Sequence, residues 1–225
     1  DTGALDPVGA LAEVAARHGA RLHVDAAYGG GLLFSDALRG RLDGIGRADT
    51  VTVDLHKFGW QPIPAGVLVA RRPADLAALA VTADYLNAGD DTAAGLPDLL
   101  GRSLRTSRRA DALKLAVTFA ALGRAGLGAL VERCCATASE VARRISARPA
   151  LRLWAEPELS TVVFRPAGAG DEAVTALRRA LLLDGRAVLG RAVAANRVWL
   201  KLTLLDPTVD ADAYDGLLDL VRDAA

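Results

Sequence analysis

The sequence predicts an α/β fold followed by a smaller α+β part, and two observations support this prediction. Short β-rich segments alternate with helical segments over the first half of the 225 residues, a pattern typical of βαβ units and a largely parallel sheet. A long helical pattern follows, and after Pro149 strands and helices recur at closer spacing. The equal numbers of basic and acidic residues, 27 of each, exclude the basic excess that a nucleic-acid or anionic-membrane surface needs.

The elements of the first half follow from apolar spacing and turn residues. Apolar residues at helical spacing predict a helix over residues 8–18, which Gly19 ends. Runs rich in β-branched and apolar residues predict strands at 21–24, 50–53 and 67–70. Residues 84–107 are expected to form a long loop, and long loops in compact domains are often functional.

The second half begins with a helical pattern from residue 108 to about residue 147, interrupted near 123–128. Strands at 160–164 and 197–205 and helices at 171–183 and from 210 onward complete an α+β unit. We therefore expect two domains. Residues 1–107 are predicted to be part of a large α/β domain, and residues 108–225 a bridging helix and a small C-terminal domain.

The cellular setting is predicted from the ends of the chain and from its cysteines. No signal peptide opens the sequence, and no apolar run reaches the ~18 residues of a membrane span. The chain contains no methionine, so we expect a processed N-terminus with a segment missing upstream. The adjacent Cys134 and Cys135 fit neither a disulfide framework nor a zinc site. They predict a packing role, a reducing cytoplasmic location and no metal.

Two ionisable residues stand at the predicted ends of neighbouring strands. Asp25 follows the first strand and Lys57 follows the second, and ligands of open α/β sheets bind at the carboxyl ends of the strands. A partly desolvated lysine there can form a Schiff base with a carbonyl. An aspartate nearby can keep a pyridine nitrogen protonated, which is the pairing that pyridoxal phosphate chemistry uses. Alone, such an aspartate is usually a cap and such a lysine a solvated side chain, so the joint pattern carries the prediction.

Five segments resemble the group II pyridoxal-phosphate-dependent amino-acid decarboxylases, which act on aromatic amino acids, glutamate, 2,4-diaminobutyrate or lysine. These segments are HVDAAYGG at 23–30, ADTVTVDLHK at 48–57, QPIPAGVLV at 61–69, and ADYLN at 83–87 followed by SLRTSRRADALKL at 103–115. The resemblance is specific to about residue 123 and looser beyond it. It implies the aspartate aminotransferase fold (fold type I), with the C-terminal part of the large domain plus the small domain.

The resemblance also implies roles for four residues and a cofactor, pyridoxal 5′-phosphate. Lys57 matches the Schiff-base lysine, and Asp25 matches the carboxylate that pairs with the pyridine nitrogen. Ala27 matches the small residue packed under the cofactor ring. His56 lies where the family has a histidine near the phosphate and the substrate, and we expect it to act in catalysis with Lys57.

Other positions are less certain by the same resemblance. Asp54 stands where the family often has an asparagine near the phosphate, and a carboxylate there would repel the phosphate unless it points away. Arg108 matches an arginine whose role we leave open. Leu99 occupies the position of a tyrosine proton donor found in several animal members, so the donor to Cα is unidentified, although Tyr85 is near in sequence. The family's phosphate-binding loop and ring-stacking histidine lie upstream of residue 1.

The predicted function is decarboxylation of an L-amino acid, such as 2,4-diaminobutyrate or lysine, by a pyridoxal-phosphate-dependent carboxy-lyase of the bacterial diaminobutyrate/lysine type. The expected partners are the amino-acid substrate and either a second copy in a homodimer or an upstream segment. Two alternatives stay open. One is another fold type I enzyme, a lyase or a desulfurase. The other is a non-catalytic fragment or partner subunit of a split decarboxylase.

Overall fold

The computed structural model describes residues 1–81, 83, 85–86, 88–96, 99–102, 106–107 and 109–223. Its contacts form two compact units. The first, which we call the β1–β3 unit, comprises Pro7–Gly30 and Leu42–Gly123. The second, which we call the C-terminal unit, comprises Asp1–Asp6, Gly31–Arg41 and Arg124–Ala225.

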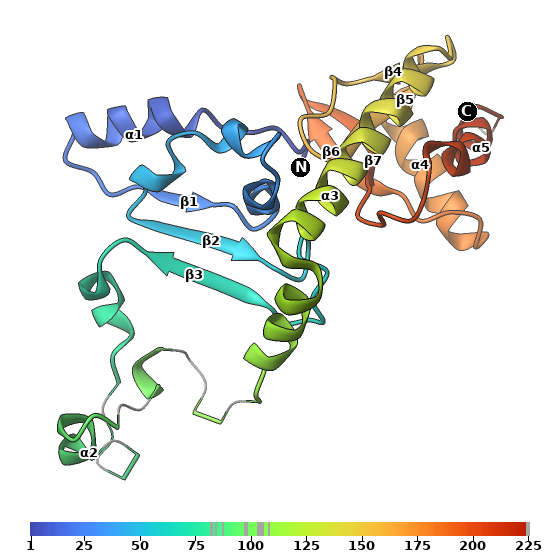
Figure 1. Cartoon of the computed structure of the whole chain (residues 1–225). Helices are drawn as coiled ribbons and strands as arrows, with labels where there is room; N and C mark the ends of the chain where they lie inside the picture. Colours follow the sequence, from blue (N-terminus) through green and yellow to red (C-terminus); the bar gives the residue numbers. More distant parts are fainter. Residues whose placement is uncertain are drawn as a thin grey trace. The chain divides into compact units, whose positions relative to one another are not determined.

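The β1–β3 unit contains a three-stranded sheet (Figure 1). Its strands are β1 (His23–Asp25), β2 (Thr50–Asp54) and β3 (Gly66–Ala70), preceded by helix α1 (Val8–Arg17). Strand β1 pairs with β2 in parallel, whereas β2 pairs with β3 antiparallel. The predicted helix and the second and third strands are confirmed, and the first strand lies two residues later than expected.

The expectation of a largely parallel sheet is wrong for β3. Parallel neighbours need a crossover connection of a dozen or more residues, usually a helix. Only residues 55–65 separate β2 from β3, and they form a short loop that contains Gly59, Pro62 and Pro64. The chain therefore reverses and returns beside β2.

Side chains alternate across β2 so that polar residues share one face. Asp25 lies opposite Thr52 in the parallel register, and Asp54 lies two residues further along β2. Because successive side chains point to opposite faces of a strand, Thr52 and Asp54 lie on one face and Val53 on the other. Gly30 packs against Val53 so closely that an added Cβ would lie 2.8 Å from its Cγ1. The carboxyl end of the β1–β2 pair thus has one polar and one tightly packed apolar face.

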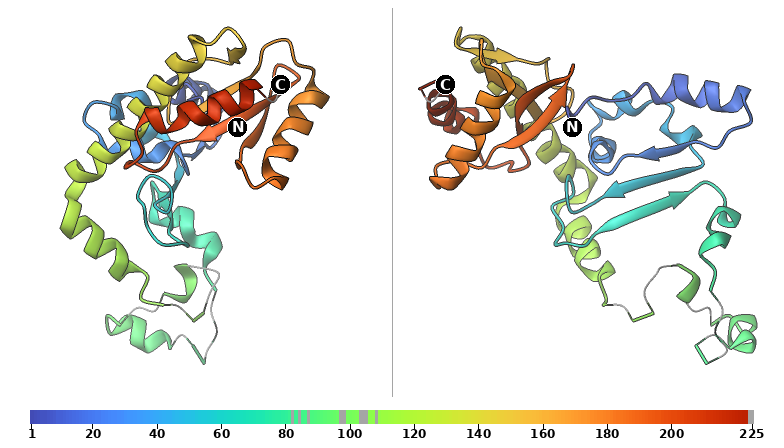
Figure 2. Two further views of the ribbon diagram at one scale, coloured as in Figure 1. Left: turned by 90° about the vertical axis from the view of Figure 1, so that its right-hand side faces the viewer. Right: turned by 180° about the vertical axis from the view of Figure 1, so that it is seen from behind.

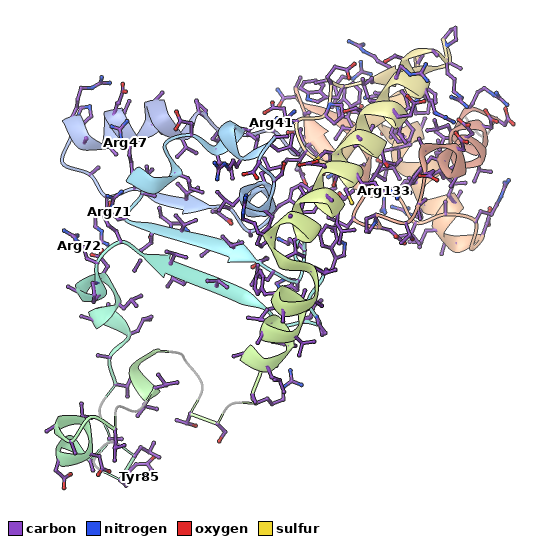
Figure 3. The ribbon with its side chains drawn as sticks, in the orientation of Figure 1. Arg41, Arg47, Arg71, Arg72, Tyr85 and Arg133 are labelled. Carbon is purple, nitrogen blue, oxygen red and sulfur yellow. The ribbon has the colours of Figure 1, made fainter. Side chains whose placement is uncertain are left out.

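The predicted loop at 84–107 is only partly irregular in the residues that the structure describes. It contains the short helix α2 (Gly89–Ala93) and a 3-10 turn at Leu100–Arg102. Tyr85 is 86% exposed and lies well away from the carboxyl ends of β1 and β2 (Figure 3). Tyr85 is therefore not placed to serve that edge of the sheet in this structure.

The C-terminal unit is an antiparallel sheet with helices packed beside it (Figure 2). The strand order is β4-β5-β7-β6. The strands are β4 (Leu151–Leu153), β5 (Thr161–Pro166), β6 (Gly190–Ala194) and β7 (Arg197–Thr203), and the helices are α4 (Asp171–Leu183) and α5 (Asp215–Asp223). One apolar core joins these helices to the sheet and to the later part of helix α3 (Ala112–Ser146).

The strands at 160–164 and 197–205 and the helix at 171–183 are confirmed within one or two residues. The predicted helix from 210 starts as a 3-10 turn (Ala211–Tyr214) before α5. The sequence analysis missed β4 and β6. Both are short strands at the edges of the sheet, where too few residues alternate to give a period-two pattern.

Helix α3 begins at Ala112, later than the expected residue 108, and is interrupted at Gly123. Gly123 has φ 61° and ψ −177°, which is not helical and which glycine adopts without a Cβ clash. The two compact units divide at this glycine rather than at 107/108. The start of α3 belongs to the β1–β3 unit because Lys114 Nζ donates to Pro62 O (2.6 Å) and Pro64 O (2.8 Å).

By length and composition alone, α3 could cross a membrane, so the expectation that no segment reaches that threshold is wrong. Only 17% of the apolar window that gives this result is buried, and the buried part of the helix lies mostly further along the chain. Residues 127–145 of α3 contribute nine buried residues to the C-terminal unit, including Val131, Ala138 and Ile145.

The two cysteines of α3 are buried and free. Burial, as the largest cause, raises the pKa of each thiol to about 11. At pH 8 on the order of one thiol in a thousand is then ionised, and the thiolate is the reactive form. We expect Cys134 and Cys135 to resist alkylation by iodoacetamide in the native protein and to react fully in urea. Mass spectrometry of the alkylated chain checks this, and rapid native labelling would contradict the packing role.

Candidate active site at the carboxyl ends of β1 and β2

The two predicted chemical groups lie at one edge of the sheet. Asp25 is the last residue of β1, and Lys57 follows the end of β2 by three residues. Since β1 and β2 are parallel neighbours, their carboxyl ends meet at the same edge. The positive charge of Lys57 is among the influences that lower the pKa of Asp25. The structure therefore brings the predicted pair together.

Asp25 is held by hydrogen bonds to one of its oxygens. Its Oδ1 accepts from Ala27 N at 3.0 Å and from Thr52 Oγ1 at 3.2 Å. The Ala27 bond is the largest cause that keeps the pKa of Asp25 below its ordinary value of 3.8, and the Thr52 bond, Lys57 and His23 act in the same direction against desolvation. Asp25 is thus a fixed, exposed carboxylate. In the described part of the chain, its Oδ2 accepts no hydrogen bond and is open to a further donor.

The small residues after Asp25 continue the pairing with β2. Ala26 N donates to Thr52 O at 2.9 Å, and Asp54 N donates to Ala27 O at 3.2 Å. The backbone at Ala27 is therefore fixed between the two strands, and its methyl side chain leaves room beside Asp25. Next along the chain, the Tyr28 ring stacks on the Phe58 ring with centroids 5.1 Å apart. This stack connects the segment after β1 to the segment that carries Lys57.

Lys57 and His56 share one carboxylate oxygen. Asp54 Oδ2 lies 3.0 Å from Lys57 Nζ and 3.5 Å from His56 Nε2. All three side chains are partly exposed, Lys57 at 37% and the other two at 23%. On the other side of the ring, His56 Nδ1 accepts from Ala65 N at 3.3 Å. The sequence analysis placed Asp54 near a phosphate, whereas here its carboxylate is engaged by the lysine and the histidine.

The turn that carries Lys57 is closed by backbone hydrogen bonds. Leu55 N donates to Ala65 O at 2.7 Å, and Gln61 N donates to Leu55 O at 3.0 Å. Gly59 lies so close to this junction that an added Cβ would stand 2.5 Å from Leu55 O, closer than any side chain allows. Lys57 therefore projects from a defined loop.

The remaining predicted positions add no described contact at this edge. Arg108 lies outside the described residues. Leu99 is 59% exposed and belongs to the segment after α2. An open cavity of about 630 Å³ is lined by Gln61, Lys114 and neighbouring residues, but its lining contains none of the four predicted site residues. Arg47, Arg71 and Arg72 lie at the opposite end of the sheet (Figure 3).

Thr52 is a site residue that the sequence analysis missed. Its signal was present in the TVTVD pattern of residues 50–54. Alternate positions of that strand are polar, so Thr52 was predictable on the same face as Asp54. The partner across β1 was not predictable, because it depends on the register that places Asp25 opposite Thr52.

A lysine and a hydrogen-bonded aspartate at the carboxyl ends of adjacent parallel strands define a class, the fold type I proteins that use pyridoxal phosphate. The residues at this edge fit the aldehyde and the ring nitrogen of pyridoxal phosphate. Lys57 supplies an amine, and Asp25 has an acceptor oxygen open to a ring nitrogen. The chain matches the pyridoxal-dependent decarboxylase conserved domain over residues 1–167, and it belongs to this family.

The relatives agree with this assignment. The chain is 44% identical to an L-2,4-diaminobutyrate decarboxylase of Rhizobium meliloti (strain 1021) over its whole length, covering 46% of that protein. It is 36% identical to the enzyme of the same name from Acinetobacter baumannii, over 97% of this chain and 44% of that protein.

A solved structure shows the same fold. It is the crystal structure of the glutamate decarboxylase domain of a diaminobutyrate-pyruvate transaminase and L-2,4-diaminobutyrate decarboxylase from Vibrio parahaemolyticus. The TM-score is 0.82 at 32% identity, covering 100% of this chain and 44% of that chain. The chain thus spans about half the length of the relatives it matches.

Proposed function

We propose that this chain is the lysine-bearing part of a pyridoxal-phosphate-dependent carboxy-lyase that decarboxylates an L-diamino acid, with L-2,4-diaminobutyrate as the first candidate. The observation that carries the proposal is the pair Lys57 and Asp25 at one sheet edge, in a chain of this family. The two diaminobutyrate decarboxylases among its relatives support the choice of substrate. L-Lysine is the second candidate.

The chain's own residues supply three contributions at this edge. Lys57 would hold the cofactor covalently through its amine, and after releasing it to the substrate would be the nearest amine to donate or accept a proton. Asp25 would face the ring nitrogen and keep a proton there, because its charge is fixed by Ala27 N and Thr52 Oγ1. When bound, pyridoxal phosphate supplies a ring that withdraws the electron pair left on the α-carbon as CO2 departs.

His56 and Ala27 complete the proposed cofactor site. Ala27 is held between β1 and β2 by its backbone, so its small side chain presents a fixed surface against which a flat ring can pack. His56 is held on both ring nitrogens by Asp54 and Ala65. It contributes a positioned imidazole beside Lys57.

An assay of products tests the proposed reaction. The protein is incubated with pyridoxal phosphate and L-2,4-diaminobutyrate, and CO2 and 1,3-diaminopropane are quantified beside parallel reactions with L-lysine and L-glutamate. We expect diamine and CO2 in equal amounts, fastest with diaminobutyrate. Release of ammonia or sulfide without CO2 would instead support a different lyase or a desulfurase.

The β1–β3 unit offers surfaces that fit a further protein segment. Strands β1 and β3 are both edges of the three-stranded sheet, and edge strands carry unpaired backbone groups. Large apolar side chains are exposed on β3 and on the first part of α3. They include Leu68 at 46%, Val69 at 51%, Leu113 at 65% and Val117 at 60%. We propose that an upstream segment or a second copy of the chain covers part of this surface.

The isolated chain of residues 1–225 is expected to bind pyridoxal phosphate weakly and without a stoichiometric endpoint. Phosphate sites are usually built from backbone N–H groups at a helix N-terminus together with hydroxyl groups, and each charge-assisted hydrogen bond contributes roughly 1.5–3 kcal/mol. The sequence has no GxGxxG or GxxxxGK[ST] pattern. Titration followed by visible absorbance checks this expectation. Tight one-to-one binding with turnover would contradict it and would show that the chain is self-sufficient.

The cytoplasm is the proposed location of the protein. The free, adjacent cysteines are compatible with a reducing compartment. Cell fractionation with an antibody to the chain tests this, and recovery in the membrane or exported fraction would contradict it.

A further inference from the structure

Asp54 connects the two side chains that follow β2, although the family resemblance ranks it below Lys57 and His56. It is the last residue of β2, and its position is fixed by the Asp54 N–Ala27 O hydrogen bond. Its Oδ1 lies on the side of Gly66, whose added Cβ would stand 3.5 Å from that oxygen. The other oxygen, Oδ2, is directed toward Lys57 Nζ and His56 Nε2. The carboxylate therefore sits between the strand and the loop that carries the lysine.

One hydrogen bond and one close carboxylate contact of His56 indicate which ring nitrogen carries the proton. Ala65 N is a donor, so His56 Nδ1 is the acceptor and is unprotonated in that contact, although at 3.3 Å the bond is long and holds this tautomer only weakly on its own. The neutral ring then carries its proton on Nε2, which faces the Asp54 carboxylate at 3.5 Å. In this arrangement the only lone pair of the neutral imidazole is already used by Ala65 N. His56 is therefore arranged to donate a hydrogen bond and not to accept a proton.

We propose that Asp54 is a positioning residue for the cofactor lysine, and that its Oδ2 holds Lys57 Nζ and the Nε2–H tautomer of His56 at the sheet edge before the cofactor binds. This role rests on the proposed function of Lys57 but assigns a separate task to Asp54. The lysine side chain has four rotatable bonds, so its amine can occupy many positions. The Asp54 carboxylate, at 3.0 Å, restricts where that amine lies. The same oxygen connects the histidine, so the loss of Asp54 affects both side chains together.

The first test uses the cofactor-free protein and does not depend on any activity. Nitrogen-15 spectra of the imidazole rings report the tautomer, and the chain contains only three histidines. We expect His56 to show a protonated Nε2 and an unprotonated Nδ1. In Asp54→Ala we expect a shift toward a mixture of tautomers, because the remaining Ala65 bond is long. In Asp54→Asn the side-chain oxygen still accepts, so most of the wild-type signature should return.

The second test measures capture of the cofactor by Lys57. The full chain is mixed with millimolar pyridoxal phosphate, reduced with borohydride at timed intervals, and the label on the Lys57 peptide is quantified. We expect about tenfold slower labelling in Asp54→Ala, because the amine is then no longer held at the sheet edge by the ion pair, and partial recovery in Asp54→Asn. Asp49→Ala is the matched control at the opposite end of β2, where Asp49 Oδ2 accepts from Leu22 N, and it should label at the wild-type rate.

The outcomes separate this proposal from the proposed function. Wild-type labelling and an unchanged His56 spectrum in Asp54→Ala would overturn the positioning role. A protonated Nδ1 in the wild type would overturn the assigned tautomer and with it the role of Asp54. If Lys57 is not labelled in the wild type, the proposed function fails, while the spectra still decide whether Asp54 holds His56.

Discussion

Replacing Lys57 with alanine is expected to abolish borohydride-stable attachment of pyridoxal phosphate and to lower decarboxylation by at least ~10²–10⁴-fold, the range lost with a positioned proton-transfer group. Lys57 is the only one of the three lysines at the carboxyl end of a strand in the β1–β3 unit. The measurements are peptide mapping after reduction and turnover of the cofactor-loaded protein, which keeps its upstream or partner segment if it has one.

The other two lysines provide the control for this experiment. Lys114 is committed to Pro62 O and Pro64 O, and Lys201 pairs with Asp1 at 2.9 Å in the C-terminal unit. Lys201→Ala should therefore keep the label and the turnover. Recovery of the pyridoxyl label on Lys114 or Lys201 in the wild type would falsify the assignment of Lys57.

Replacing Asp25 with alanine is expected to leave some cofactor binding and to reduce turnover on the order of 10²–10³-fold, the scale of one preorganised electrostatic contact at a reacting group. The carboxylate's contribution is its charge, which favours a protonated ring nitrogen. Asp25→Asn keeps an oxygen that can accept from Ala27 N and Thr52 Oγ1 and loses only the charge. It should be nearly as impaired as Asp25→Ala, and near-wild-type turnover of either variant with cofactor bound would rule out this role.

The lowered pKa of Asp25 determines the pH range over which its carboxylate is charged and can act as predicted. Because the folded protein lowers that pKa below 3.8, the hydrogen bonds of the charged form contribute stability above pH 3.8, and this contribution is lost as the pH falls through the lower folded value. Asp25 therefore stays ionised throughout the neutral and mildly acidic range. Thr52→Val removes one of the bonds and should raise the pKa of Asp25, which carboxyl carbon-13 NMR titration can measure.

The sequence predicted the family, and the sheet edge at which Asp25 and Lys57 lie, better than it predicted the sheet topology. Asp25 and Lys57 were predictable because short strands with turn residues mark where each strand ends, and the fold brings parallel ends together. The direction of β3 depends on the length and composition of the segment at 55–65, which local patterns do not specify. The interruption near 123–128 was predicted from the glycines there, and the structure places it at Gly123. The missed Thr52 and the contacts of Asp54 depend on strand register and on side-chain direction, which local patterns do not specify.

The division of the chain into two compact units at Gly123 also depends on contacts between distant residues. The sequence pattern predicts a bridging helix from residue 108 with an interruption near 123–128, but it does not show to which compact unit the first turns of that helix belong. The bonds of Lys114 to Pro62 and Pro64, fifty residues earlier in the chain, decide instead that the first turns of α3 belong with β1–β3. Contacts over such a separation follow from the tertiary structure and cannot be derived from local periodicity.

The closed turn between β2 and β3 determines when the lysine loop loses its conformational freedom. Ordering one backbone residue costs roughly 1–2 kcal/mol of entropy, and bonds within the chain itself, between Leu55 and Ala65 and between Gln61 and Leu55, fix this loop. That entropy is therefore lost when the chain folds and not when a ligand arrives. Calorimetry of cofactor binding should accordingly show no large entropic penalty from this loop, and amide hydrogens at residues 55–61 should exchange at similar rates before and after binding.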